Sequence, residues 1–351
     1  MTRTVASIRA LVRPPFAVLL ALSFAIGAAQ TGHFPSLLRQ AMALATIAAW
    51  MLCAVALNDY SDEQIDRVNL AEDPRRLLVT GLATRKRVLW TGLIAAIVAL
   101  AVALLLGPEI SVVVAGGVAL AIAYSMPPFS LSRRGIVASA ALPLGYVAIP
   151  FLIGSFASGV SPSANSLRLL AGLYLGFMGR LALKDFRDER GDRLYGKRTT
   201  LVRYGRQRTC VFSGGFWAAG GLVVLSAVPR TPAVAAAVVL DIISVGILLA
   251  ALARDRHGRD DPANIAAIAA IGRGFLATIL LALVVAANGW SAVATNAIVG
   301  LFAGTALVFA WECRTALLSS VDELTLDELE AFASPAPVDQ TNEWARNRFT
   351  P

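Results

Sequence analysis

Charged residues, histidine and cysteine are all scarce in this chain. Asp, Glu, Lys and Arg make up 15% of the 351 residues, whereas soluble domains contain about 25%. The sequence has two histidines and three cysteines, and Cys53, Cys210 and Cys313 are spaced too widely to indicate a metal site or a disulfide framework. Zinc chemistry and covalent catalysis through a Cys/His pair are therefore not predicted.

Hydrophobic residues, at 57% of the chain, are abundant. A membrane core about 30 Å thick is crossed by about 20 mostly apolar helical residues, and lipid requires every backbone polar group to be bonded internally. Ten apolar runs predict an all-α, polytopic transmembrane helical bundle. They lie at 15–31, 37–58, 88–106, 109–125, 137–157, 165–184, 209–229, 232–253, 263–288 and 291–312.

Positive charge is concentrated in alternate connections between these runs. Of the 31 Lys and Arg residues, 27 lie in the N-terminal segment, the loops 59–87, 126–136, 184–208 and 254–262, at Arg273 and in the C-terminal tail. The positive-inside rule assigns these segments to the cytoplasm. This distribution explains the net charge of +8, so we expect no nucleic-acid partner.

Ten spans place both termini in the cytoplasm. We expect a cytoplasmic N-terminal segment at 1–14, one transmembrane domain at 15–312, and a cytoplasmic tail at 313–351 that begins with a short surface helix near 320–332 and is partly disordered. The expected location is the inner (plasma) membrane, with the loops that carry the site on the cytoplasmic side.

Two acidic motifs end apolar runs. "NDYSDEQID" at 58–66 places three aspartates at positions i, i+3 and i+7, and "DFRDERGD" at 185–192 repeats the spacing. On a helix these positions fall within about 60° of one another, so their carboxylates repel unless a cation lies between them. The acids could simply pair with nearby arginines. The repetition favours two facing stripes that hold Mg²⁺, which binds carboxylates together with substrate phosphates, and it hints at an internal duplication.

Basic side chains surround these acids in the same loops. Arg and Lys are the usual donors to phosphate oxygens, and Arg binds them as a two-pronged fork. The arrangement predicts a cytoplasmic pocket for a polyanion below an apolar bundle. A ligand with a diphosphate head and a hydrocarbon tail fits both parts.

The motifs resemble those of the UbiA superfamily of intramembrane prenyltransferases. "NDYSDEQID" is similar to its N-D-x-x-D-x-x-x-D signature, "DFRDERGD" to its second aspartate motif, and "YSMPPFSLSRRG" at 124–135 to its Y-S-x-P-P-x-x-x-x-R segment. The sequence of the stretch 184–205 is especially similar to that of the branch that contains homogentisate prenyltransferases and chlorophyll synthases. The resemblance spans about residues 10–290.

The resemblance implies a horseshoe of nine core helices around a central cavity, to which 291–312 would add a tenth span. It also implies a Mg²⁺-dependent transfer of a prenyl group from a prenyl diphosphate donor to a lipophilic, aromatic acceptor, with membrane lipid as the surroundings. The implied catalytic residues are Asp59, Asp62, Asp185 and Asp188. The implied metal ligands are these four with Asp66 and Asp192. The implied substrate-binding residues are Asn58, Asp66, Asp192, Tyr124, Arg133, Arg134, Lys184, Lys197 and Arg198.

Some features depart from the family pattern or leave the outcome open. The basic R-P segment that follows the first motif in many members reads "DPRRLLVTG" here, which weakens the assignment of Arg75 and Arg76. A membrane terpene cyclase would use the same acids for ionisation, so it stays an alternative, as does a transporter or ion-binding membrane protein. Aromatic rings that could face an allyl cation are Trp50, Tyr146, Phe151, Tyr174 and Phe177.

Overall fold

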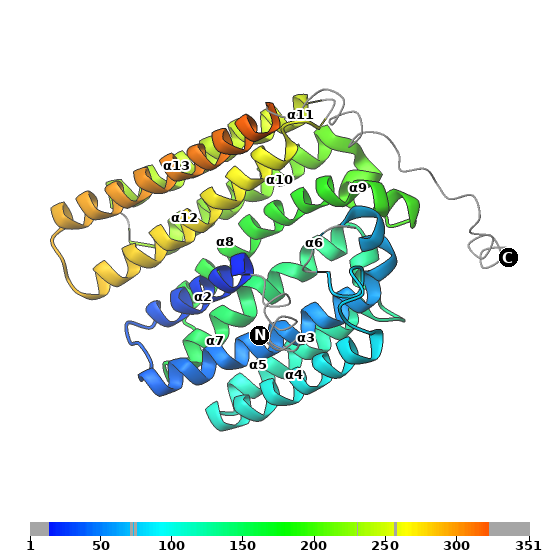
Figure 1. Cartoon of the computed structure of the whole chain (residues 1–351). Coiled ribbons are helices and arrows are strands. Elements are labelled where there is room, and N and C mark those ends of the chain that lie inside the picture. The colour runs from blue at the N-terminus through cyan, green and yellow to red at the C-terminus, as the bar shows by residue number, and fades with distance from the viewer. Residues whose placement is uncertain (1–13, 71–72, 74–75, 230, 256–257, 323–351) are drawn as a thin grey trace, which may run out of the picture.

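The computed structural model describes residues 14–70, 73, 76–229, 231–255 and 258–322, and this part of the chain is all helical (Figure 1). The first half contains α2 (Pro14–Ala29), α3 (Leu37–Asn69), α4 (Arg85–Leu106), α5 (Pro108–Ser125), η1 (Leu131–Arg133), α6 (Ile136–Pro143), η2 (Leu144–Ala148) and α7 (Ile149–Ala157). The second half contains α8 (Ala164–Leu181), η3 (Ala182–Lys184), α9 (Asp185–Leu194), α10 (Thr200–Ala227), α11 (Pro232–Arg254), α12 (Asp261–Ala287) and α13 (Ala292–Asp322).

Nine of the described helical stretches are long and apolar enough to cross a membrane, and they coincide with nine of the ten predicted spans. The predicted first span is α2, which has 16 described residues. At 1.5 Å per residue it measures about 24 Å, less than the core thickness of about 30 Å. The span predicted at 291–312 is present as α13, so the multi-pass bundle is confirmed. The predicted tail beyond residue 322 lies outside the described residues, as do residues 1–13.

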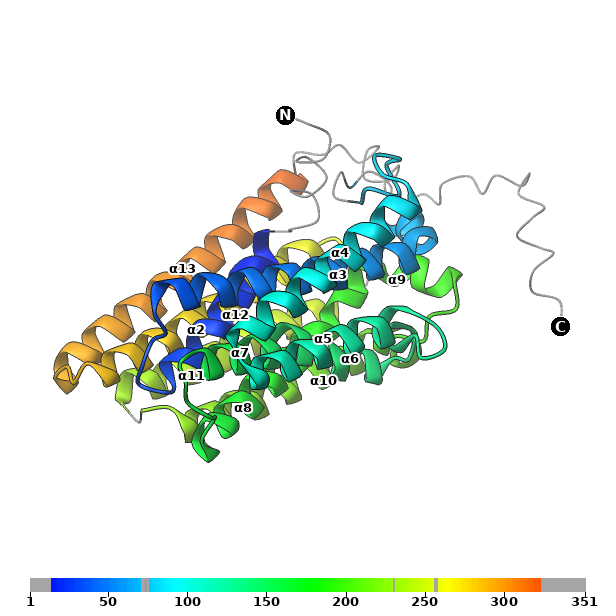
Figure 2. The ribbon, with the colours of Figure 1, turned by 90° about the horizontal axis from the view of Figure 1, so that it is seen from below.

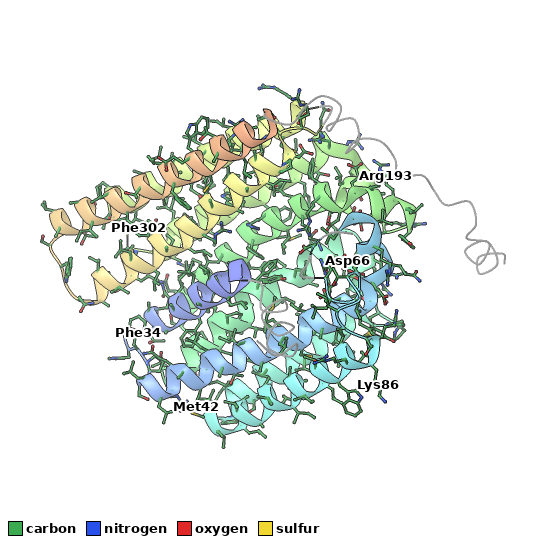
Figure 3. The ribbon with its side chains drawn as sticks, in the orientation of Figure 1. Phe34, Met42, Asp66, Lys86, Arg193 and Phe302 are labelled. Atoms are coloured by element: carbon green, nitrogen blue, oxygen red, sulfur yellow. The ribbon has the colours of Figure 1, made fainter. Side chains whose placement is uncertain are left out.

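The helices alternate in direction, so the described chain begins and ends at the same end of the bundle as the acidic motifs (Figures 1 and 2). Arg314 of α13 donates to Asn264 at the start of α12, at 3.0 Å. Figure 3 places Asp66, Lys86 and Arg193 at this end, while Phe34 lies toward the opposite end. The charge asymmetry of the sequence therefore corresponds to the two ends of the molecule.

Two membrane-spanning stretches contain a segment that is not α-helical: a π-helical segment in one and a 3₁₀ turn in the other. The span 136–157 is a continuous helix through α6, η2 and α7 that contains Pro143 and a π-helical segment at Leu144–Ala148. A proline or a π segment bends a helix because it interrupts the regular bonding ladder. α8 continues through the 3₁₀ turn η3 into α9, and this turn carries Lys184 to the start of the second motif.

Small residues allow the backbones to approach closely, as is usual where lipid provides no hydrophobic drive between helices. A Cβ on Gly220 of α10 would meet Gly176 N and Gly172 O of α8, and a Cβ on Gly154 of α7 would meet Phe24 O of α2. α2 packs against both α7 and α12. These contacts fix the walls around the interior.

We expect Gly220→Ala to destabilise the bundle, because the added methyl group would clash with backbone atoms of α8 and force the two helices apart. Overpacking of this kind costs about 1–3 kcal/mol. Gly215 is on the same helix, and a Cβ added there would have no other atom within 4 Å. Gly215→Ala is therefore the matched control. Thermal unfolding in detergent should show a lower midpoint for Gly220→Ala alone; equal midpoints would contradict this packing.

Candidate active site

The two acidic motifs meet at the mouth of one cavity of about 290 Å³. One end of this cavity, which we call the polar end, is lined by Asn58, Asp62, Asp66, Asn69, Arg76, Tyr124, Lys184, Asp185, Arg187, Asp188, Asp192 and Lys197. The other end is apolar, with walls that include Trp50, Leu120, Leu142 and Tyr146. The lining residues come from both halves of the chain.

The first motif lies on the last turns of α3, where the helix extends beyond its apolar run. Arg76, from the following loop, inserts a nearly buried guanidinium that pairs with Asp59 and, at 2.9 Å, with Asp66. Asp62 accepts hydrogen bonds from Asn58 Nδ2 at 3.0 Å and from Ser61 Oγ at 3.4 Å. Asp62 and Asp66 line the cavity, whereas Asp59 does not and binds Arg76 instead.

The second motif is the helix α9. Asp188 pairs with Arg187, whose Nε is 2.9 Å from Asp188 Oδ1. Asp185 is 4% exposed and lines the cavity, yet its carboxylate has no hydrogen bond or ion pair with any residue in the described ranges. Its carboxylate is therefore free to bind something that enters the cavity.

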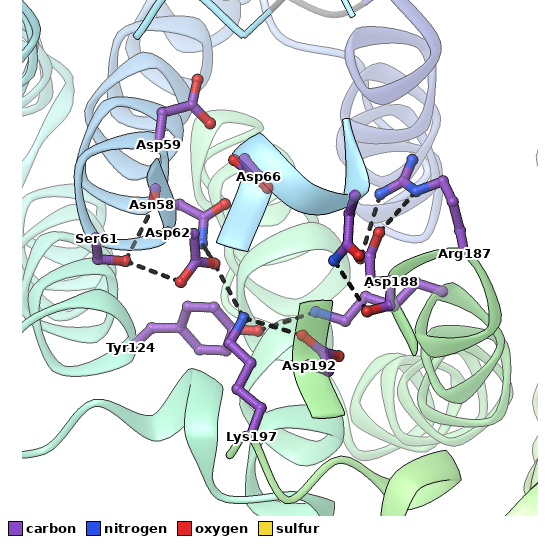
Figure 4. Close-up of polar contacts among 12 residues, drawn as sticks. Asn58, Asp59, Ser61, Asp62, Asp66, Tyr124, Arg187, Asp188, Asp192 and Lys197 are labelled. Carbon is purple, nitrogen blue, oxygen red and sulfur yellow. Dashed lines mark hydrogen bonds and ion pairs between the residues drawn. The ribbon is translucent and has the colours of Figure 1, made fainter. Parts of the chain in front are cut away.

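Three contacts join the two halves across the polar end (Figure 4). Lys197 Nζ lies 3.2 Å from Asp62 Oδ2 and 3.7 Å from Asp192 Oδ1, so one cation bridges both motifs. Asn69 donates from Nδ2 to the Asp188 carbonyl at 2.9 Å and accepts from the Gly191 amide at 2.6 Å. Lys184 Nζ donates to Tyr124 Oη at 3.3 Å.

The structure brings most of the predicted site residues together but leaves some outside. Asn58, Tyr124, Lys184, Lys197 and the aspartates other than Asp59 line the cavity. Arg133, Arg134 and Arg198 are exposed and lie outside its lining. They follow the positive-inside pattern, which puts cations at this end of the bundle without aiming them inward.

Sequence reasoning missed Asn69 and Gly191 and gave Arg76 too little weight. Asn69 continues the first stripe, since it stands at i+10 from Asp59, three residues beyond Asp66, and that spacing could have identified it. A Cβ on Gly191 would lie 2.7 Å from both Asn69 Oδ1 and Nδ2, so this glycine makes room for the bridge. Arg76 could not be assigned because loop geometry decides which arginine turns inward.

Of the five candidate aromatic residues, Trp50 and Tyr146 line the apolar part of the cavity. Phe177 lines a neighbouring cavity. Phe151 is completely buried in the helix core, and Tyr174 donates its hydroxyl hydrogen to Ala140 O at 2.7 Å. The rings of Trp50 and Tyr146 are thus the ones placed to contact a hydrocarbon chain.

The acids fit Mg²⁺ by donor chemistry. The Asp185 carboxylate lines the cavity and has no hydrogen bond or ion pair within the described ranges. The buried Asp192 Oδ1 accepts no hydrogen bond, although Lys197 Nζ lies 3.7 Å away. Within the described ranges no three acidic, His or Cys side chains are already grouped as a metal site. Mg²⁺ usually binds through one or two carboxylates and completes its shell with substrate phosphates and water.

Charge and shape together define what the cavity can hold. Its polar end offers cationic donors from Arg76, Lys184, Arg187 and Lys197 beside free carboxylate oxygens, and its other end is apolar. Phosphate oxygens and a metal ion can therefore be bound at the same place, with a hydrocarbon chain extending into the helices.

Comparison with curated proteins finds relatives of two kinds. The bacteriochlorophyll synthase 34 kDa chain of Chloroflexus aurantiacus is 30% identical over 159 residues, which are 44% of this chain and 50% of that protein. Digeranylgeranylglyceryl phosphate synthase of Pyrococcus abyssi is 31% identical over 160 residues, 46% of this chain and 54% of that protein. The chain thus spans about half the length of the curated relatives it matches.

Solved structures share the fold. A digeranylgeranylglyceryl phosphate synthase structure aligns with a TM-score of 0.60 at 17% identity and covers 82% of this chain and 99% of its own. A UbiA homologue from Archaeoglobus fulgidus bound to GPP and Mg²⁺ aligns with a TM-score of 0.55 at 16% identity, covering 89% and 99%. The family model described as the UbiA prenyltransferase family matches residues 17–271, which run from within α2 to the first turns of α12. The chain therefore belongs to the UbiA prenyltransferase family.

Proposed function

We propose that this protein is an intramembrane prenyltransferase that ionises a prenyl diphosphate with Mg²⁺ and transfers the prenyl group to a lipophilic acceptor. The observation that carries the proposal is the meeting of both acidic motifs, one from each half of the chain, at the polar end of a single cavity whose other end is apolar. The A. fulgidus homologue was solved with GPP and Mg²⁺ and also with DMAPP and Mg²⁺. Each of these two ligands has a diphosphate head and a hydrocarbon tail.

The diphosphate head would lie at the polar end. Lys184, Lys197, Arg76 and Arg187 line that end and can donate to phosphate oxygens through charge-assisted hydrogen bonds. Asp185, Asp188 and Asp192, with Asp62 and Asp66 opposite, would hold the metal. Mg²⁺ bound there would neutralise negative charge on the diphosphate oxygens. Asp59 would act by holding Arg76 in place.

The reaction breaks the bond between the allylic carbon and the diphosphate oxygen, and the bonding electron pair leaves with the diphosphate. Fixed cations aimed at the leaving oxygens stabilise that charge as it develops. The allyl cation then forms a bond to the acceptor, which loses a proton. The apolar wall around Trp50 and Tyr146 keeps water from capturing the cation, and the ring faces attract its positive charge.

The proposed location follows from charge. The motif-bearing end holds the loops rich in Lys and Arg, and the positive-inside rule assigns that end to the cytoplasm. A water-soluble diphosphate head would enter from the cytoplasm while the prenyl chain and the acceptor come from the lipid. The membrane would be the inner (plasma) membrane.

Replacing Asp185 should abolish ionisation, because its unpaired carboxylate is the oxygen donor most available to the metal. We expect Asp185→Ala to lower diphosphate release from geranylgeranyl diphosphate by at least about 100-fold, roughly 2.7 kcal/mol of transition-state stabilisation. Glu189 is on the same helix but pairs with Arg193 outside the cavity, so Glu189→Ala should stay near the wild-type rate. Retention of a tenth of the rate by Asp185→Ala would rule out its role.

The bridge between Asn69 and α9 should behave as one unit. Asn69→Ala removes the side chain that holds the Asp188 and Gly191 backbone, and Gly191→Ala adds a methyl group where that side chain lies. Each should raise the Mg²⁺ concentration needed for half-maximal activity by about tenfold. In a double-mutant cycle, the double variant should match Asn69→Ala because the methyl group then has room. Effects that multiply would show that the two residues act separately.

Activity should require a divalent cation and should prefer Mg²⁺ to Ca²⁺. The oxygen donors on α9 are few, and a phosphate-bridging site suits the smaller ion with its octahedral shell. Purified protein assayed in excess EDTA should release no diphosphate, and added Mg²⁺ should restore release. Full activity in EDTA would exclude the metal. With added acceptor, a cyclised hydrocarbon as the main product would instead identify a terpene cyclase.

A further inference from the structure

A second cavity of about 130 Å³ lies beside the first, mostly between helices of the second half of the chain. Its walls are contributed mainly by α8, α10 and α12, with smaller contributions from α2, η2 and α11. Phe16 and Arg180 line both cavities. A ligand in the second cavity would therefore lie directly beside the prenyl chain. None of the motif aspartates lines the second cavity, so an anion there is not repelled by them at contact.

Two arginines inside membrane-spanning helices face this cavity without a counterion. Arg180 of α8 and Arg273 of α12 line it, and neither guanidinium group forms a hydrogen bond or an ion pair with any residue of the described chain. Arg180 Cζ lies 5.8 Å from the centre of the Phe177 ring. Arg180 Cδ lies 3.9 Å from the point that a Cβ added at Gly272, the neighbour of Arg273, would occupy. The two positive charges act on each other.

Unpaired cations in a membrane-spanning region are costly and mark ligand sites. Two like charges beside one cavity add repulsion to that cost. An anionic group between the guanidinium groups would relieve both, and each arginine can bind a carboxylate or a phosphate through paired hydrogen bonds. The charges thus point to an anion, not to a neutral lipid.

The same cavity contains an acceptor of hydrogen bonds, contributed by α11. Asp241 of α11 is 4% exposed and receives a hydrogen bond from Trp217 Nε1 at 2.7 Å, while its Oδ1 has no partner. Asp241 also lines the cavity. A ligand that carries an anion at one position and a hydroxyl or N–H group at another would satisfy both the arginines and Asp241.

We propose that this cavity is the acceptor subsite, in which Arg180 and Arg273 bind a carboxylate or phosphate group of a lipophilic acceptor and Asp241 accepts a hydrogen bond from it. The inference rests on the proposed function, since it places the acceptor beside the prenyl diphosphate. It adds the chemical class of the acceptor: a molecule with an apolar body and an anionic group. The donor diphosphate stays with the motif aspartates and Mg²⁺ in the first cavity.

The test uses the full-length protein in detergent and three probes of equal apolar body: 4-octylbenzoic acid, its methyl ester and 4-octylphenyl phosphate. Wild-type protein should bind the acid, the phosphate or both at least tenfold more tightly than the ester. Arg180→Gln and Arg273→Gln should remove that preference without weakening ester binding. Arg208→Gln, which alters an exposed arginine of α10, should keep the preference. Which anion binds more tightly identifies the headgroup.

Folding and donor binding are controlled separately. Arg180→Lys and Arg273→Lys retain the charge without the fork, so they should keep part of the preference even if the Gln variants do not fold. Equal binding of acid, phosphate and ester by wild-type protein would overturn the proposal.

A second result would also overturn it. If the Arg variants lost affinity for inorganic diphosphate with Mg²⁺ but kept the preference for an anion over the ester, the arginines would serve the donor. Failure of wild-type protein to release diphosphate from geranylgeranyl diphosphate would overturn the proposed function and would leave the anion result intact.

Discussion

The architecture of this protein depends on neutralising carboxylates at the end of a membrane bundle. Two stripes of aspartate would repel each other if they faced one another alone. Lys197 bridges Asp62 and Asp192, and Arg76 pairs with two acids of the first stripe. These cations make the meeting of the two halves possible, and they line the place where a diphosphate would bind. The same charges therefore stabilise the junction of the two halves and suit it to a diphosphate.

Close packing of the membrane-spanning helices supports the junction of the two acidic motifs. Gly220 against α8 and Gly154 against α2 let backbones touch, which holds the helices in fixed positions in the absence of a hydrophobic drive between them. The bend in the span 136–157 and the turn at η3 then carry side chains to the cavity. Rigid walls suit the proposed chemistry, because a reactive cation has to be shielded from water.

The two cavities divide the proposed reaction by charge. The first joins acids, cations and an apolar wall, as a diphosphate with a metal and a hydrocarbon chain requires. The second has arginines without counterions and a half-satisfied aspartate, as an anionic acceptor requires. Arg180 lines both cavities and so stands at their boundary. Two anions can thus be bound close together, each with its own counter-charges.

Much of the site followed from the sequence because it depends on local rules. Apolar length determined the helices, the distribution of Lys and Arg determined which end is charged, and the i, i+3, i+7 spacing put Asp62 and Asp66 on one face, with Asp185, Asp188 and Asp192 on another. Tertiary structure alone decided which cations turn inward, since Arg76 enters the cavity and Arg133, Arg134 and Arg198 do not. It also decided that Asn69 reaches Gly191, more than 120 positions away. Helical periodicity specifies the face on which a residue lies, but only the packing of distant segments specifies what that face meets.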